Sequence, residues 1–344
     1  MIIPAGLLLA ACVSAAPRAL DARAADIGAA ALLEVRDLPI DANTSAAIAQ
    51  QAERGWLDGL FNNKYTDGPA LDVTADSPQW ATWAHYQAAV YCGPARFDHW
   101  QCGENCDAVG PTAVIGYGGD NEANPWWYVA DRGDTLVIAI AGTNTKSAKS
   151  IAIDLNILLV PADRGLFPDS KGVLVHAGVQ DAFRRMAPGL TAAVRKGLAL
   201  PGPPRRVTVL GHSLGGAIGH LVAVYLQRLL PEVVVIARPF ASFRVGNPAW
   251  ANYVDATLGD RAQHMVNFND VVPHLPPKDW GWRHSSNEVW IPKLGGPELR
   301  LCSGQENVKC SDSLNFGFAL ISSFIKYADK EVHSGPYAGV MIKC

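Results

Sequence analysis

The segment that most constrains the fold is a short glycine-rich stretch between an apolar run and a helical pattern. Residues 206–210 are almost entirely β-branched or apolar, which is typical of a buried strand. Gly211-His212-Ser213-Leu214-Gly215 follows at once, and helical patterning runs from about 214 to 230. Ser213 is therefore expected at a tight strand-to-helix corner, where the flanking glycines avoid collisions that a Cβ would cause.

Strands and helices alternate along most of the chain. Apolar runs at 126–130 and 135–140 flank Asp131-Arg132-Gly133-Asp134, the signature of a hairpin. The other expected elements are strands at 233–237 and 263–268, and helices from about 45, over 77–90 and over 179–200. Buried β-branched runs that alternate with helices predict an α/β fold, with a largely parallel central sheet covered by helices on both faces.

The strand–turn–helix context makes Ser213 a candidate nucleophile, as in the nucleophile corner of α/β-hydrolase folds. Such a corner lifts the hydroxyl above the sheet edge, at a helix N-terminus whose free N–H groups favour negative charge. The alternative is a glycine-rich turn with a helix-capping serine, and the flanking strand and helix favour catalysis over it. A serine hydroxyl also needs a base that removes its proton during attack.

The acid and the base are expected downstream of Ser213, in the order Asp or Glu and then His. His220 lies seven residues further on the following helix and cannot point back, and His264 falls within a predicted strand. The remaining candidate bases are His274, His284 and His333. Asp270 is the best candidate acid, because it follows the strand at 263–268 and the carboxyl ends of parallel strands hold the working groups of α/β sheets.

Composition bounds the class of protein. The chain has 344 residues, of which 49% are hydrophobic and 18% are charged, enough for one large core. A net charge of −3, without blocks of like charge, gives no reason to expect nucleic acid or an anionic membrane as partner. Residues 17–40 are expected to form a pro-segment or flexible linker, and 41–344 a single catalytic domain.

The N-terminus resembles an export signal. Residues 2–16 are apolar and small, with a small-residue cleavage site at 13–16, so 1–16 is interpreted as a signal peptide. The stretch is shorter than the roughly 20 residues of a membrane span, so no transmembrane segment is expected in the mature protein. A lipoprotein box with Cys12 lipidated is the alternative. Export makes the sequon at Asn43 a candidate glycosylation site.

Six of the seven cysteines remain once Cys12 leaves with the signal. An even number in an exported protein predicts three disulfides. Proximity along the chain favours two short loops and leaves one long bridge; the expected pairs are Cys102–Cys106, Cys302–Cys310 and Cys92–Cys344. Zinc is the alternative, but no compact set of Cys and His accompanies the short pair, so no metal is expected.

Several motifs point to one family. The matching segments are 86–92, Gly211–Ala217, Arg244–Asn247, Asn269–Pro277 and 288–291, with His333 ahead of a terminal cysteine. In these motifs, between about 79 and 344, the chain resembles the class 3 lipases of fungi, typified by secreted triacylglycerol lipases of filamentous fungi. The Asn-Asp-x-Val-Pro-x-Leu-Pro-Pro segment is specific to that family.

The resemblance implies roles for particular residues. Asp270 would be the acid and His333 the base, and His284 would lie next to the site without transferring protons. Tyr337 departs from the pattern, because it follows His333 by four residues where the family has an aromatic about three residues on. The resemblance implies the Cys92–Cys344 and Cys102–Cys106 pairs as well, and it associates Cys302–Cys310 with a subset of these lipases.

An oxyanion intermediate needs two hydrogen-bond donors. One is expected from the backbone N–H of Leu214 and the other from a loop after an earlier strand, which residues 140–145 fit. The resemblance assigns the second donor to Thr143, although the segment is also compatible with a plain turn. It further implies a mobile lid after this loop, and residues 144–159 are compatible with a lid or with a loop leading into a buried strand.

The implied function is secreted lipase activity on acylglycerols through a Ser-His-Asp triad and an acyl-enzyme. A lipid or other ester, at a lipid–water interface, would be the substrate, and no cofactor is implied because acyl transfer needs only protons and fixed dipoles. Two alternatives remain: an esterase for feruloyl or other soluble esters of the same fold, and a catalytically silent binding protein.

Overall fold

The computed structural model describes residues 41–62, 66–147, 154, 156–202, 206–314 and 330–344. Their strands form one nine-stranded sheet, in the order β1-β11-β10-β9-β8-β7-β4-β3-β2, and a two-stranded sheet, β5-β6. The strands are β1 (Ala70–Asp72), β2 (Ala113–Gly118), β3 (Trp127–Asp131), β4 (Thr135–Ile140), β5 (Leu159–Pro161), β6 (Leu174–His176), β7 (Arg206–His212), β8 (Val234–Phe240), β9 (His264–Asn267), β10 (Glu288–Ile291) and β11 (Arg300–Cys302). The expected signal peptide and linker, 1–16 and 17–40, lie outside the described residues.

The centre of the large sheet is parallel. Strands β10, β9, β8, β7 and β4 run in one direction, and antiparallel strands extend the sheet at both edges. The expected hairpin is the antiparallel pair β3 and β4, with Asp131 opposite Leu136. The prediction of a largely parallel α/β sheet is therefore confirmed for the central strands.

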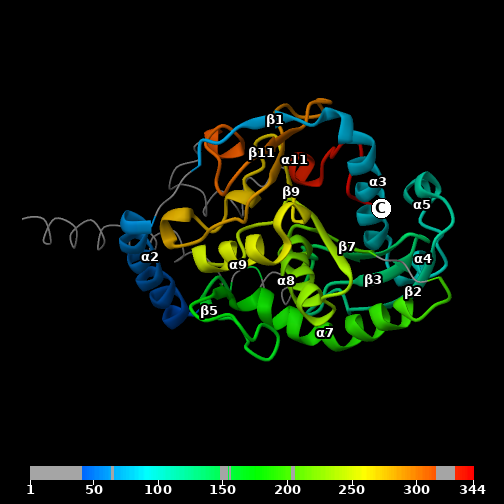
Figure 1. Ribbon diagram of the computed structural model, residues 1–344, viewed down its shortest axis with the longest axis horizontal. Coiled ribbons are helices and arrows are strands. Elements are labelled where there is room, and N and C mark those ends of the chain that lie inside the picture. The colour runs from blue at the N-terminus through cyan, green and yellow to red at the C-terminus, as the bar shows by residue number, and fades with distance from the viewer. Residues whose placement is uncertain (1–40, 63–65, 148–153, 155, 203–205, 315–329) are drawn as a thin grey trace, which may run out of the picture.

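Helices cover both faces of this sheet (Figure 1). They are α2 (Ala42–Asn62), α3 (Ser77–Ala89), α4 (Pro94–Phe97), α5 (Glu104–Val109), α7 (Ala177–Leu198), α8 (Leu214–Leu229), α9 (Pro248–Leu258) and α11 (Lys330–Ser334), with short 3₁₀ turns η1 to η6 at Thr74–Asp76, Val90–Cys92, Gly259–Arg261, Val272–His274, Lys278–Trp280 and Ser311–Leu314. Among the described helices, none is long and apolar enough to cross a bilayer.

Alternate side chains of each central strand enter two different cores. Leu136 and Ile138 of β4 pack with α7, α8 and α9. Val137 and Ala139 of the same strand pack on the opposite face, with α3, η2 and the C-terminal segment. This period of two is the reason why continuous apolar runs form strands that are buried on both faces.

Three disulfides join the cysteines in the expected pairs, Cys102–Cys106, Cys302–Cys310 and Cys92–Cys344. The third joins residues 252 positions apart, and Figure 1 shows the C-terminus beside α3. Closing so long a loop restricts the unfolded chain and stabilises the fold by about 5 kcal/mol in the chain-entropy model.

Candidate functional site

The corner at Ser213 joins β7 to α8 and has an uncommon backbone conformation. Ser213 has φ 57° and ψ −126°, a region in which L-residues are strained. A Cβ on Gly211 would lie 2.0 Å from the carbonyl oxygen of Gly215, and a Cβ on Gly215 would lie 2.2 Å from that of Ile140. Both positions therefore require glycine, and the backbone turns sharply between strand and helix as the sequence predicts.

Asp270 and His333 are joined by a hydrogen bond. Asp270 follows β9, is 3% exposed, and its Oδ2 lies 2.8 Å from His333 Nδ1. Its Oδ1 accepts the backbone N–H of Val272 at 3.0 Å. Because a carboxylate can only accept, His333 Nδ1 carries the proton and Nε2 of the neutral ring is left as a proton acceptor.

His333 also lies beside the Ser213 corner. The ring centroids of His333 and His212, the residue before Ser213, are 4.6 Å apart. Of the other candidate bases, His284 places Nε2 at 2.7 Å from the carbonyl oxygen of Pro273, and His274 is buried in η4. The described structure therefore brings Ser213, His333 and Asp270 to one end of the parallel strands.

The candidate oxyanion loop lies next to the same corner. Ile140 at the end of β4 pairs with Gly211 on β7, so Thr143 follows beside the turn that carries Ser213. The Thr143 hydroxyl donates to Asp154 Oδ2 at 2.7 Å. Leu214 is the first residue of α8, so its N–H is among those with no partner inside the helix.

Asp154 was not singled out by the sequence reasoning, since nothing in its local pattern distinguishes it within 144–159, the segment compatible with a lid or with a loop leading into a buried strand. Burial raises the pKa of this carboxyl to about 7, against the lowering effects of the Thr143 hydroxyl and of His333. Residues 148–153 and 155 of this segment lie outside the described residues, so both interpretations stay predictions.

Tyr337 makes a direct contact at this site despite its unexpected spacing. Its hydroxyl donates to the backbone carbonyl of His333 at 3.0 Å. The four-residue spacing is therefore accommodated by a turn that brings the Tyr337 hydroxyl back to the His333 backbone, while the ring packs against His212 and Phe240. The sequence signal was the aromatic residue itself, but its partner is a backbone atom that no pattern reveals.

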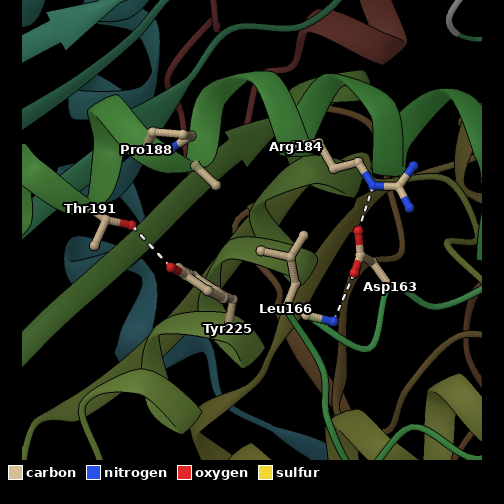
Figure 2. A pocket seen from close by; sticks show the side chains of 8 residues that line it. Asp163, Leu166, Arg184, Pro188, Thr191 and Tyr225 are labelled. Carbon is tan, nitrogen blue, oxygen red and sulfur yellow. Dashed lines mark hydrogen bonds and ion pairs between the residues drawn. The ribbon is translucent and has the colours of Figure 1, made fainter.

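A cavity of about 470 Å³ lies elsewhere, along α7 and α8 (Figure 2). Its lining includes Asp163, Leu166, Arg184, Pro188, Thr191 and Tyr225. Tyr225 is twelve positions after Ser213, or about 18 Å along the helix axis. Figure 2 shows Arg184 paired with Asp163, and their Nε and Oδ2 atoms are 2.7 Å apart, so these two charges satisfy one another rather than face a ligand.

One group of potential metal ligands occurs among the described residues: Glu288, Cys302 and Cys310. The two cysteines are bonded to each other, so neither offers a thiolate. Both Glu288 oxygens accept hydrogen bonds from Ser311. This group is a structural contact beside a disulfide and not a metal site.

Comparison with known proteins gives a consistent family. A family model described as lipase (class 3) matches residues 137–280. A relative named as secreted mono- and diacylglycerol lipase MDL2 of Malassezia globosa is 33% identical over 248 residues, covering 71% of this chain and 78% of that protein.

Solved structures agree with the sequence comparison. Lipase II of Rhizopus niveus has a TM-score of 0.64 at 27% identity, covering 76% of this chain and 97% of its own. A triacylglycerol lipase whose catalytic centre is described as a serine protease triad also has a TM-score of 0.64, at 28% identity, with 77% and 98% covered.

Proposed function

The chain belongs to the class 3 lipase family, and from this premise we propose that it is a secreted lipase that hydrolyses the ester bonds of acylglycerols. The observation that carries the proposal is the contact between the buried carboxylate of Asp270 and His333 Nδ1, 2.8 Å long, beside the strained corner at Ser213. This contact leaves the second ring nitrogen free to act as a base toward a hydroxyl.

The proposed mechanism uses the three side chains in turn. Neutral His333 takes the proton of Ser213 as the hydroxyl attacks the ester carbonyl, and Asp270 orients the ring and stabilises its charged form. The backbone N–H groups of Leu214 and Thr143 stabilise the oxyanion, and each donor contributes about 3 kcal/mol to lowering the barrier. The alcohol leaves with a proton from His333, and water then repeats the sequence on the acyl-enzyme.

The hydrogen bond between Thr143 and Asp154 supports the oxyanion assignment, because it gives the Thr143 side chain one orientation at the end of the loop after β4. Because the hydroxyl proton is directed at Asp154, the donor to the oxyanion is the backbone N–H of Thr143, which the held side chain keeps in place.

Acylglycerols are the proposed substrate class because the similar proteins are named as mono- and diacylglycerol or triacylglycerol lipases. A lipid–water interface is the proposed place of action. Export is supported by the three disulfides, which form in oxidising compartments, and by the names of the secreted relatives. Asn43 is exposed in the first turn of α2, which makes it an accessible glycosylation acceptor.

The test is a substrate panel on the purified protein: emulsified monoacylglycerol, diacylglycerol and triacylglycerol, and methyl ferulate. We expect hydrolysis of glycerides, and Ser213→Ala to reduce kcat by roughly 10⁶-fold with the fold retained. Ser170→Ala is the matched control, since Ser170 is buried and donates to the carbonyl of Phe167 in the loop before β6.

Preferential turnover of methyl ferulate would replace the lipase proposal with a soluble-ester esterase. Absence of turnover, together with failure of a fluorophosphonate to label Ser213, would instead support a silent binding protein.

A further inference from the structure

A chain of hydrogen bonds runs behind the Ser213 corner. The backbone N–H of Gly142 donates to the Tyr91 hydroxyl at 2.8 Å, and the same hydroxyl lies 2.7 Å from His212 Nδ1. His212 Nε2 lies 2.7 Å from the backbone carbonyl oxygen of His333. Three segments that are distant in the sequence therefore meet through two side chains.

The direction of each hydrogen bond in this chain follows from the chemistry of its ends. The carbonyl oxygen of His333 can only accept, so His212 carries its proton on Nε2. The ring is neutral, because burial lowers the pKa of His212 to about 3, with a smaller lowering effect from the neighbouring His333. Nδ1 is then an acceptor, and the Tyr91 hydroxyl donates to it while accepting from Gly142.

Packing leaves this arrangement little freedom. A Cβ on Gly142 would lie 2.6 Å from the Tyr91 hydroxyl oxygen and 2.8 Å from the His212 carbonyl oxygen. The rings of Tyr91 and His212 contact each other edge to face, with centroids 5.9 Å apart. Tyr91 is also next to Cys92, the residue that anchors the C-terminus through its disulfide.

The backbone of His333 is held by more than one donor. His212 and Tyr337 both donate to its carbonyl oxygen, and the side-chain amide of Asn267 donates to the carbonyl of the preceding residue, Val332, at 2.7 Å. Of the two donors to His333, His212 is the one that is continuous with the Ser213 corner.

We propose that Tyr91 and His212 are positioning residues for catalysis, which set the backbone of His333 against Ser213 and against the loop of Thr143. The inference rests on the proposed function, since it assigns a task to groups that touch neither substrate nor reacting atoms. Reacting groups must be placed within a fraction of an ångström, and a displacement of about 1 Å costs on the order of 100-fold in rate.

The neutral state of His212 is part of this task. His333 becomes positively charged during attack, and its ring centroid is 4.6 Å from that of His212. A charged His212 would oppose that step at close range in a water-poor environment. A neutral ring with a fixed tautomer holds the carbonyl without this penalty.

The first test is Tyr91→Phe, with Tyr128→Phe as the matched control. Tyr128 also has a buried hydroxyl that donates to a backbone carbonyl, that of Tyr86 at 2.6 Å, but it has no part in the chain of hydrogen bonds behind Ser213. We expect Tyr91→Phe to lower kcat about tenfold with KM within about twofold, and to slow fluorophosphonate labelling of Ser213 in parallel. Tyr128→Phe is expected to lower the melting temperature and leave kcat unchanged.

The second test compares His212→Gln with His212→Asn. The Gln amide nitrogen reaches about as far as Nε2 of the imidazole and can donate to the His333 carbonyl, whereas that of Asn cannot. We expect Gln to retain about tenfold more of kcat than Asn at similar melting temperatures.

Unchanged kcat in Tyr91→Phe, or equal kcat in the two His212 variants, would overturn the positioning role while Ser213→Ala still abolishes wild-type activity. An inactive, unlabelled wild-type protein would overturn the proposed function itself, so the two failures are distinguishable.

Discussion

The Ser213 corner, residues 206–217, and the C-terminal segment, residues 330–344, bring the proposed nucleophile and base together by different means. The corner is shaped by neighbours in sequence: Gly211 and Gly215 permit the close approach, and the helix starts at the next residue. The C-terminal segment is held by distant partners, at separations of 252 residues for Cys92 and 121 for His212. A local conformation is thus encoded locally, whereas a position in space depends on the whole fold.

The largest expected effect comes from the contact that orients His333. Asp270→Asn is expected to lower kcat about 10⁴-fold, because an amide can hold the ring in the wrong tautomer. This corresponds to about 5.5 kcal/mol in the barrier. Steady-state kinetics on a soluble ester measures it, with the exposed Asp107→Asn as control. A kcat within tenfold of wild type would mean that Asp270 does not serve His333.

Removing the covalent tether of the C-terminal segment is the next largest change. The pair Cys92→Ala and Cys344→Ala is expected to lower the free energy of unfolding by about 5 kcal/mol, since the closed loop is long. Cys102→Ala with Cys106→Ala is the control, and its short loop predicts about 2 kcal/mol. Urea denaturation measures both, and equal losses would show that loop length is not what matters.

The corner is tested by adding a single methyl group. Gly215→Ala is expected to destabilise the fold by about 3 kcal/mol, because the new Cβ meets two carbonyl oxygens at 2.2 and 2.4 Å. Gly216→Ala, whose Cβ would meet its nearest atom at 3.1 Å, is expected to cost less than about 1 kcal/mol. Thermal melts compare the two, and a similar loss in both would refute the steric account of the corner.

The smallest expected effect is a change in the free energy of unfolding with pH. It comes from His212, the residue that connects the Ser213 corner to the C-terminal segment. Burial lowers the pKa of His212 in the folded state to about 3, from an ordinary value of 6.5. Between these two pKa values the unfolded chain binds a proton on His212 and the folded chain does not. The stability that the neutral ring contributes is therefore fully present above pH 6.5 and is lost as pH falls toward 3.

At pH 5 the loss from this single group is about 2 kcal/mol. The unfolding free energy of His212→Gln should consequently fall less steeply between pH 6.5 and 5 than that of the wild type, when both are measured by urea titration. Parallel slopes would show that His212 is not held neutral.

The corner and Asp270 were predictable from the sequence for a physical reason. Buried strands are continuous apolar runs, and the residues that directly follow them lie at one sheet edge, so Ser213 and Asp270 were placed by counting from 206–210 and 263–268. Strand β4 has the expected bounds, Thr135–Ile140.

The base could not be chosen in this way. The sequence pattern left three candidate histidines. It could not select His333, because the segment of His333 reaches the site through contacts with residues far away in the chain. Only the family resemblance favoured His333. The hydrogen-bond partners of Tyr91 and His212 could not be predicted from the sequence either, because they also lie far apart in the chain. The same holds for the short edge strand β1, because its three residues pair with β11 some 230 positions away.

The bridge between Cys92 and Cys344 also limits when the disulfides of this protein can form during synthesis. At about 5–20 residues per second, a ribosome needs roughly 13 to 50 s to make the 252 residues between the two thiols. During that interval Cys92 emerges together with Cys102 and Cys106 and is open to wrong pairing with them. The Cys92–Cys344 bridge can form only after residue 344 has been made, and any wrong pair formed earlier has to be undone by thiol–disulfide exchange.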